Sequence, residues 1–183
     1  MKKDASKLMS EEKFWTIIEN SNRGRKLKEC LIPLSEEELF GFRYWWAYFC
    51  NLSYKQDLWA VAYVVLGGCS DDGFDYFRFW LIAQGREVFY NALENADTLC
   101  EVFSELEDPE GEDYPEQEDL AYAVKTVLQE RTGNEDYLYI VEDNYSLPQN
   151  IQEIEFEWEE DDEESIRKIC PRTFDKWWEN DVF

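Results

Sequence analysis

The most informative part of the chain is residues 57–85, DLWAVAYVVLGGCSDDGFDYFRFWLIAQG. Asp57 precedes an unbroken run of nine apolar residues, which ends at a pair of glycines. Such a run predicts a central buried helix, although a buried strand would give a similar pattern. Asp71 and Asp72 then predict the beginning of a second helix, because acidic residues favour the first turn, and Gly85 predicts its end.

Helical patterns also lie on both sides of this stretch. Ser10 precedes apolar residues at helical spacing, and Ser35 with Glu38 three residues later is a capping box. The helix after Ser35 places five apolar side chains on one stripe: Leu39, Phe42, Trp46, Phe49 and Cys50. Further helices are expected at 86–95, at 116–131 and at about 163–168, the last one ending before Pro171.

The pattern changes in the last third of the chain. Residues 137–141, YLYIV, and residues 151–158 are typical of short strands, and the second segment alternates apolar residues with glutamates. We therefore expect a mainly α-helical fold with a single compact domain. Residues 1–131 form its helical core, and residues 132–183 form an acidic extension with short strands and a final helix, packed on that core.

Aromatic residues indicate where the core lies. The chain has 31 aromatic residues among 183, and 17 of them fall between Phe40 and Tyr90. Because large aromatic side chains dominate core packing, this third of the chain is expected at the centre of the fold. Trp177 and Trp178 near the end are candidates for an interface, but packing of the last helix on the core is the favoured interpretation.

The chain contains no histidine. A Ser-His-Asp triad, a Cys-His dyad, a histidine-ligated zinc or haem and a histidine pH switch are therefore excluded. The five cysteines are odd in number and have no close pair, which favours reduced thiols in the cytoplasm over disulfides. Cys69 follows the glycine pair, but without a histidine partner a nucleophilic role for it is disfavoured.

Negative charge is concentrated in two segments. The chain has 42 acidic and 18 basic residues, which gives a formal net charge of −24. Residues 105–119 contain nine acids and no base, and residues 153–164 contain nine more acids and no base. These segments carry −18 of the −24, so the rest of the chain is close to neutral.

The acidic segments have three interpretations. They are solvated loops that keep the protein soluble, or a surface that attracts a basic partner, or a mimic of nucleic-acid phosphate. Direct binding to nucleic acid is disfavoured, because the net charge opposes the phosphate backbone. For a partner-binding surface the candidates are Glu153, Glu155, Glu157, Trp158, Glu159, Glu160, Asp161 and Asp162.

A second candidate site is the cluster of Asp71, Asp72, Asp75 and Arg78. Asp71 and Asp75 are four residues apart and face the same way on a helix, and Arg78 is within ion-pair reach of Asp75. Carboxylates in this arrangement could perform acid–base chemistry or assist a metal. The favoured interpretation is structural, because acids in a first turn complement the helix dipole.

Motifs for cofactors and metals are not found in this stretch. Two adjacent aspartates followed by aromatic residues do not fit the alternating ligands of an EF-hand loop. The Gly67-Gly68 pair has neither the spacing of a P-loop nor that of a dinucleotide fingerprint. We therefore expect no cofactor and no metal.

The same stretch resembles a known family. Asp57-Leu58-Trp59-Ala60, Gly67 to Arg78 and Trp80 to Arg86 are similar to the signature of a bacterial family, domain of unknown function 4240, and the similarity covers about residues 10–131. The resemblance implies a small, mainly helical cytosolic domain with no established catalytic activity, and it supplies no function. Some acidic domains of this size act as immunity proteins encoded beside antibacterial toxins, which is an analogy.

These observations favour a binding protein over an enzyme. The leading hypothesis is a cytoplasmic immunity-type protein, whose acidic surface blocks the basic active-site cleft of a cognate antibacterial toxin. The alternatives are an enzyme that uses the aspartate and arginine cluster and an inhibitor that mimics nucleic acid. The longest apolar run has nine residues and the N-terminus lacks the apolar core of a signal peptide, so neither a membrane segment nor secretion is expected.

Overall fold

The computed structural model describes residues 1–148 and 153–179. Over these residues the chain is mainly α-helical, as expected, with a single two-stranded sheet. The elements in chain order are β1 (Lys3–Asp4), η1 (Ala5–Lys7), α1 (Glu11–Asn20), α2 (Leu27–Leu31), α3 (Glu36–Leu52), α4 (Gln56–Leu66), α5 (Asp71–Ala83), α6 (Arg86–Glu94), η2 (Ala96–Thr98), α7 (Leu99–Ser104), η3 (Glu118–Tyr122), α8 (Ala123–Thr132), α9 (Tyr137–Glu142), β2 (Tyr145–Ser146), α10 (Glu163–Ile169) and α11 (Pro171–Trp177).

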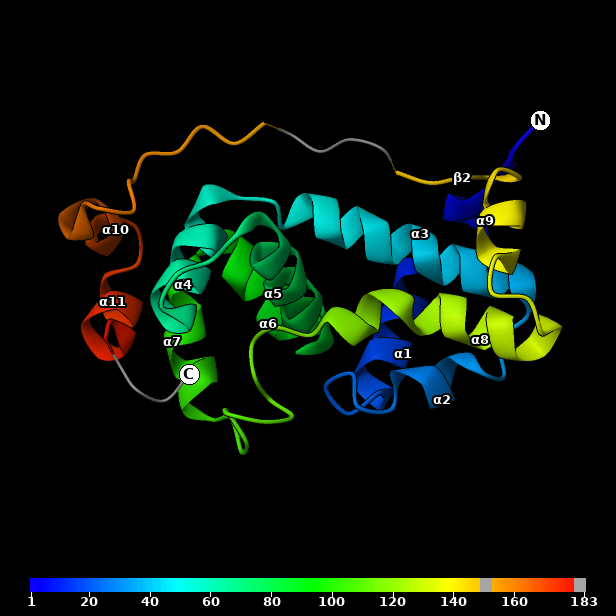
Figure 1. The fold of residues 1–183 in the computed structure, drawn as a ribbon, viewed down its shortest axis with the longest axis horizontal. Coiled ribbons are helices and arrows are strands. Elements are labelled where there is room, and N and C mark those ends of the chain that lie inside the picture. The colour runs from blue at the N-terminus through cyan, green and yellow to red at the C-terminus, as the bar shows by residue number, and fades with distance from the viewer. Residues whose placement is uncertain (149–152, 180–183) are drawn as a thin grey trace.

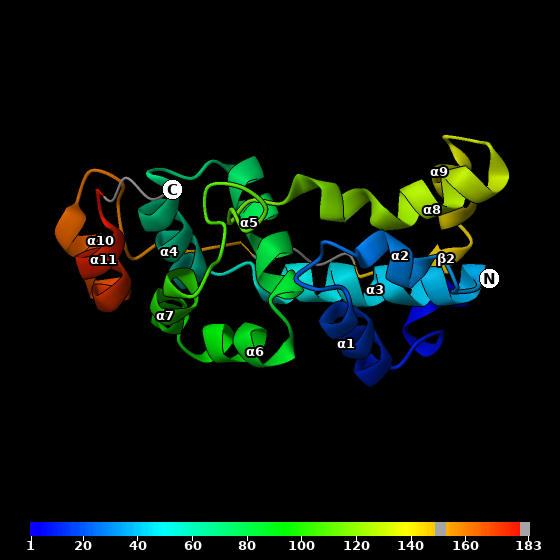
Figure 2. The ribbon, with the colours of Figure 1, turned by 90° about the horizontal axis from the view of Figure 1, so that it is seen from below.

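The helices form an elongated body with two ends (Figure 1). One end contains α1, α2, α8, α9 and the small sheet, and the other contains α4, α6, α7, α10 and α11. The long helix α3 packs against α5 where the two ends meet, and α8 lies beside α3 and α2 (Figure 2). The two ends are therefore joined through α5, which contacts α1 and α3 of one end and α4 and α6 of the other.

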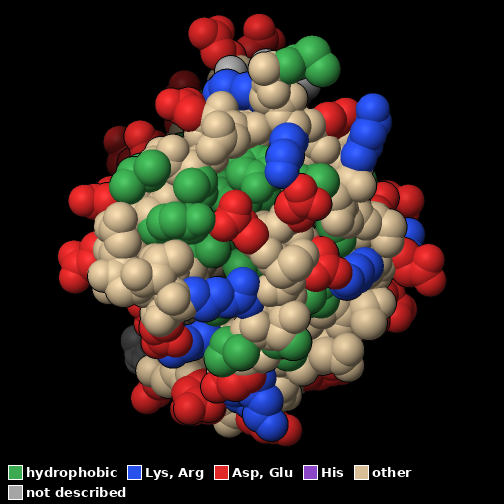
Figure 3. Space-filling model, turned by 90° about the vertical axis from the view of Figure 1, so that its right-hand side faces the viewer, with side chains coloured by type: hydrophobic (Ala, Val, Ile, Leu, Met, Phe, Trp, Pro, Cys, Tyr) green, Lys and Arg blue, Asp and Glu red, His purple; other side chains and the backbone are tan. Residues whose placement is uncertain are grey.

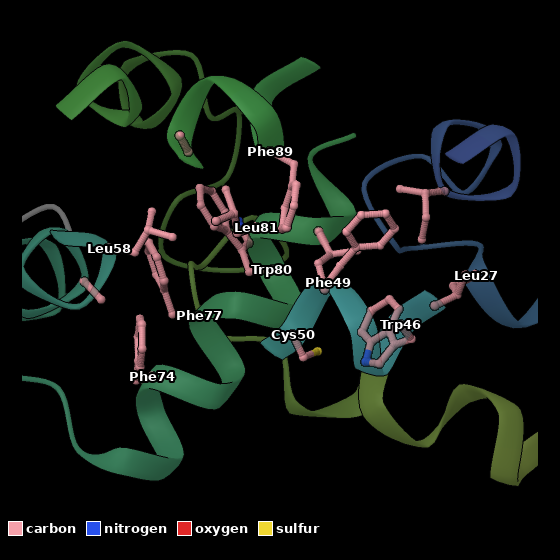
Figure 4. Packing of buried hydrophobic residues seen from close by; sticks show 14 of the residues in the cluster. Leu27, Trp46, Phe49, Cys50, Leu58, Phe74, Phe77, Trp80, Leu81 and Phe89 are labelled. Atoms are coloured by element: carbon pink, nitrogen blue, oxygen red, sulfur yellow. The ribbon is translucent and has the colours of Figure 1, made fainter. Parts of the chain in front are cut away.

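The apolar run forms the buried helix α4. Leu58, Ala60, Val61 and Ala62 are fully buried. The segment is α-helical from Gln56 to Leu66, which confirms a helix rather than a strand. Gly67 ends α4 in the left-handed conformation at φ 66°, which a residue with a side chain rarely adopts. In the core, Phe74, Phe77 and Trp80 of α5 lie between α4 and α3 (Figure 4).

The helix caps predicted at Ser10 and Ser35 are confirmed. Ser10 accepts a hydrogen bond from the Lys13 amide, and Ser35 and Glu38 form the reciprocal capping box at the start of α3. At α5 the cap is Ser70, whose hydroxyl accepts from the Gly73 amide, and Asp71 and Asp72 occupy the first turn. Each cap satisfies backbone amides that have no partner within the helix.

The extension after residue 131 contacts both ends of the body. Near the N-terminus, Tyr145 of β2 pairs in parallel with Lys3 of β1, and its ring stacks on Phe40 with the centroids 3.9 Å apart. Residues 153–162 lie next to α4 at the opposite end, and α11 packs against α4 and α7 (Figure 1). The extension therefore shares the hydrophobic core of the helices before it.

Both expected strands of the extension are wrong where the structure describes them. Residues 137–141 belong to helix α9, because Leu138 faces the core while the Glu142 carboxylate binds Arg43 of α3. Residues 153–158 belong to no helix or strand, with a bend at residue 157, and 151 and 152 lie outside the described residues. The small sheet instead joins β1 and β2, neither of which was expected.

One helix boundary differs from the prediction. The expected helix at 116–131 begins as the 3-10 helix η3 and becomes α-helical only at Ala123. The helix expected at about 163–168 is α10, which ends at Ile169 before Pro171 as predicted. The helix that follows, α11, was not expected. Pro171 is its first residue, where a proline needs no amide partner. Trp177 and Trp178 lie at the end of α11 and pack on Phe103 and Tyr63, which confirms their structural role.

The end of the body that carries α9 exposes several hydrophobic side chains. Tyr139 and Ile140 of α9 are 54% and 62% exposed. Hydrophobic side chains are visible on this face among acidic and basic ones (Figure 3). None of the described helices has both the length and the hydropathy to cross a bilayer.

Candidate functional site

The acidic segment 153–162 is fixed to the start of α4 by one residue. The amide of Glu157 donates to Gln56 Oε1 at 2.6 Å, and Gln56 Nε2 donates to the Glu157 carboxylate at 3.1 Å. The indole of Trp158 donates to the Gln56 carbonyl at 3.0 Å. These three hydrogen bonds give the segment a defined position on the surface of the protein.

Aromatic packing completes this attachment. Trp158 is 6% exposed and packs on Tyr63 of α4, with the ring centroids 5.5 Å apart. Phe156 contacts Trp59 and Trp158 edge to face at 5.4 and 5.5 Å but is 48% exposed. Trp158 therefore anchors the segment, while Phe156 presents much of its ring to solvent.

A hollow of about 350 Å³ opens beside these rings, a size at the lower end of small-ligand pockets. Its wall contains two tryptophans, a phenylalanine and three carboxylates: Trp59, Trp158, Phe156, Asp71, Glu159 and Glu160. The structure thus brings Asp71, from the predicted aspartate cluster, together with residues of the predicted acidic surface. We call this site the acidic-aromatic hollow.

The acidic residues of this region have few basic partners. All nine acids between 153 and 164 are exposed. Among the described residues, only Glu164 of the nine forms an ion pair, with Arg167 at 4.0 Å. A second depression, of about 520 Å³, lies beside the same segment and is within the size range of ligand pockets. Its lining includes four acidic and two basic residues: Glu153, Glu155, Glu157, Asp57, Lys55 and Lys168.

The predicted cluster of Asp71, Asp72, Asp75 and Arg78 does not form one site. Asp71 and Asp72 are exposed at the first turn of α5, and only Asp71 reaches the hollow. Asp75, one turn further along α5, pairs with Arg78. Among the described residues, no group of three or more Cys, Asp or Glu side chains is arranged to hold a metal ion.

Arg78 has a structural role. The residue is 6% exposed, and its guanidinium donates to the Cys50 carbonyl at 2.5 Å and to the Phe74 carbonyl at 3.3 Å. It also lies over the Tyr54 ring, 4.9 Å from the centroid. Because Cys50 is in the last turn of α3, Arg78 ties the end of α3 to α5 and is not available to a substrate.

The other acidic segment, 105–119, is partly built into the fold. Asp113 is 2% exposed and accepts hydrogen bonds from Arg25 at 2.8 Å and from the amides of Glu107 and Asp108 at 3.1 Å. Glu116 lies over Gly73, where an added Cβ would be 2.6 Å from its carboxylate oxygen. Burial raises the pKa of Glu116. Part of this segment therefore serves the structure.

All five cysteines are free thiols. Burial, with smaller contributions from Glu116 and Asp71, raises the pKa of Cys69 to about 12. With this pKa, Cys69 stays protonated near neutral pH. Because the thiolate is the reactive form of cysteine, this supports the expectation against a nucleophilic role.

The sequence identified the acidic residues of the hollow, but it did not indicate the roles of Phe156 and Trp59 in its wall or of Gln56 in holding the segment. The alternation of apolar residues with glutamates predicts a Phe156 that faces inward, whereas it is the only exposed phenylalanine among those the structure describes. Gln56 gave no signal, because its importance comes from contacts with residues a hundred positions away. Trp59 was recognised only as part of an apolar helix.

The fold and the site define a mainly helical protein with an anchored acidic surface. Residues 9–130 match the family described as "Protein of unknown function (DUF4240)". The match covers well over half of the chain, and the chain belongs to this family, as the resemblance implied. No curated protein and no solved structure matches the chain.

Proposed function

We propose that the chain is an immunity-type protein that binds a cognate antibacterial toxin enzyme in the bacterial cytoplasm and blocks its basic active-site cleft. The observation that carries the proposal is the acidic segment 153–164, whose carboxylates are exposed, almost free of basic partners and held in place by Gln56 and Trp158. A solubilising tail would not need this attachment.

Electrostatics give such a surface a function in binding. Clustered carboxylates without bases repel one another, and a basic partner relieves this repulsion when it binds. A localised negative surface also accelerates encounters with a basic partner and disfavours acidic ones. An enzyme cleft that binds phosphates or nucleotides is commonly basic, so it fits the chemistry of this surface.

The segment 153–164 is favoured over 105–119 as the binding surface. Asp113 of the latter is buried, and Glu112 is paired with Arg25 at 3.1 Å. These two carboxylates stabilise the fold and cannot meet a partner without breaking their contacts. Among the described residues of 153–164, only Glu164 has such a pairing.

The proposal is tested with the product of the adjacent gene. We expect this product to arrest growth of a host cell when expressed alone, and growth to resume when the present chain is coexpressed. The purified pair should form a complex of equal stoichiometry in which the enzyme activity is lost. An adjacent product that is harmless, or whose activity the chain leaves unchanged in a formed complex, would contradict the proposal.

Charge reversal locates the binding surface within this complex. We expect Glu159→Lys, Glu160→Lys and Asp161→Lys together to weaken binding by about tenfold or more, since interface charges govern association. Glu157 is left intact because it holds Gln56. The matched control reverses exposed residues of the other segment, Glu105, Glu107 and Glu110, and should change binding by less than about threefold. Equal losses, or a loss in the control alone, would remove 153–164 from the proposal.

The nucleic-acid mimic is a different form of inhibition. It requires that the partner's basic groove binds DNA or RNA, and that the chain and the nucleic acid compete for it. Competition in a binding assay would favour mimicry, whereas simultaneous binding would favour blockage of another kind of active site.

A further inference from the structure

The acidic-aromatic hollow combines two features that a solvated surface does not require. Phe156 is 48% exposed, whereas every other described phenylalanine is buried or half-buried. Its ring is not loose, because it contacts Trp59 and Trp158 edge to face. An aromatic ring that is fixed in position but uncovered provides a platform for a ligand.

Three carboxylates surround this platform. Asp71, Glu159 and Glu160 line the hollow, and none of them forms an ion pair with a base in the described part of the chain. The negative charge also acts on Tyr63, whose ring packs on Trp158: its pKa is raised first by burial and further by Glu160 and Asp161. A ligand that complements this hollow therefore carries a positive charge that can lie against aromatic rings.

The chemistry of the wall selects among cations. A hydrated metal ion prefers a shell of oxygen ligands, whereas half of this wall is aromatic. A guanidinium group is planar, delocalised and weakly hydrated, so it stacks on aromatic rings and forms paired hydrogen bonds with carboxylates. A lysine ammonium is a compact and strongly hydrated charge, which suits an aromatic wall less well.

We propose that the acidic-aromatic hollow binds the guanidinium group of an arginine side chain presented by a partner protein. The inference rests on the proposed function in that the partner is a protein bound by the acidic surface. The ring of Phe156 stacks on the guanidinium, Asp71, Glu159 and Glu160 accept its hydrogen bonds, and Trp59 and Trp158 form the floor. A single arginine is thereby recognised within a basic surface.

The test uses a small probe and therefore does not depend on the identity of the partner. N-acetyl-arginine methylamide is titrated into the full-length chain, and the indole N–H signals of Trp59 and Trp158 are followed by NMR. Both indoles donate to backbone carbonyls at 3.0 Å, so their signals report on the wall of the hollow. We expect saturable shifts of these two signals, with about threefold or more weaker binding of the lysine analogue.

Variants connect the shifts to the named residues. Phe156→Leu keeps an apolar contact with the tryptophans but removes the aromatic ring, and Asp71→Asn with Glu159→Gln and Glu160→Gln removes the charge. Each is expected to weaken binding of the arginine probe by about fivefold or more. Glu105→Gln, Glu107→Gln and Glu110→Gln together remove the same charge elsewhere and should leave binding unchanged. Unaltered signals of the remaining residues show that each variant is folded.

The inference is overturned if the arginine probe does not shift the two indole signals, if lysine binds as well as arginine, or if the control variant weakens binding as much as the hollow variants. Its failure is distinct from failure of the proposed function. A chain that inhibits its toxin without binding the probe would refute only the arginine site, whereas probe binding without any toxin would refute only the immunity role.

Discussion

At the scale of single residues, charged side chains in this protein serve two different purposes. Arg78 and Asp113 are buried and satisfied by several hydrogen bonds, whereas Asp71 and Glu160 are at the surface without a base. A buried charge is stable only when its partners are in place. The sequence does not separate these purposes by residue type, because the buried Asp113 lies in the same acidic segment as exposed carboxylates such as Glu110.

Arg78→Met is expected to destabilise the fold by about 2–4 kcal/mol, because the hydrogen bond from Arg78 to the Cys50 carbonyl is lost and with it the link between the end of α3 and α5. Urea unfolding measures this change. Asp75→Asn is the comparison, since Asp75 is 49% exposed and leaves the backbone contacts of Arg78 intact. It should cost less than about 1 kcal/mol. Similar losses in the two variants would show that the ion pair, and not the carbonyl contact, stabilises this region.

Asp113 and Glu112 offer a direct comparison, because both carboxylates pair with Arg25. Asp113 is buried and also accepts two backbone amides, so Asp113→Asn should cost about 2–4 kcal/mol of unfolding free energy. Glu112 is 73% exposed, so Glu112→Gln should cost less than about 1 kcal/mol. Equal effects in urea unfolding would contradict the structural role given to burial of Asp113.

At the scale of secondary-structure elements, local signals were sufficient where a cap and an apolar face coincide. The helices that begin after Ser10, Ser35 and Ser70 follow this rule. The segment 137–141 was predicted wrongly, because five apolar residues are too few to distinguish a helix from a strand. Its helix is stabilised by distant contacts, since Tyr137 donates to Glu36 and Glu142 pairs with Arg43.

The capping box of α3 should give the protein a measurable acid response. Hydrogen bonds from Lys13, then from the amide and hydroxyl of Ser35, lower the pKa of Glu38 from 4.5 to about 2. Because the folded-state pKa is depressed, this stabilisation is fully present above pH 4.5 and is lost as the pH falls towards 2.

Glu38→Gln tests this response. The stability difference between the wild type and this variant should therefore shrink between about pH 5 and pH 2 in urea unfolding. Glu12→Gln, at an exposed first-turn position of α1, is the control and should show a smaller change over this range. A stability difference between the wild type and Glu38→Gln that does not change with pH would contradict the stabilising role given to the Glu38 carboxylate.

At the scale of the whole molecule, the C-terminal extension connects the two ends of the helical body. It pairs with β1 near the N-terminus and meets α4 at the opposite end through Gln56 and Trp158. The acidic surface is therefore located by contacts between residues far apart in the chain. The core matches a family, while the segment that carries the proposed surface lies beyond the matched residues 9–130.

Trp158→Ala should release the acidic segment while the helical body stays folded. The variant loses the contact with Tyr63 and the hydrogen bond to Gln56, so cleavage by a glutamate-specific protease between 153 and 164 should accelerate by about tenfold or more. Phe156→Ala is the control, since Phe156 is exposed and its removal should accelerate cleavage far less. Equal cleavage of both variants would show that Trp158 does not anchor the segment.

The sequence by itself determined the helical class, the caps at Ser10 and Ser35, the burial of the apolar run after Asp57 and the concentration of charge in two segments. These properties follow from local spacing and composition, which act over a few residues. Only the tertiary structure decided that Arg78 is internal, that Asp71 meets Glu159 and Glu160, and that residues 137–141 form a helix. The physical reason is that burial and partnership depend on contacts between distant segments, such as Gln56 with Trp158, which the local pattern does not encode.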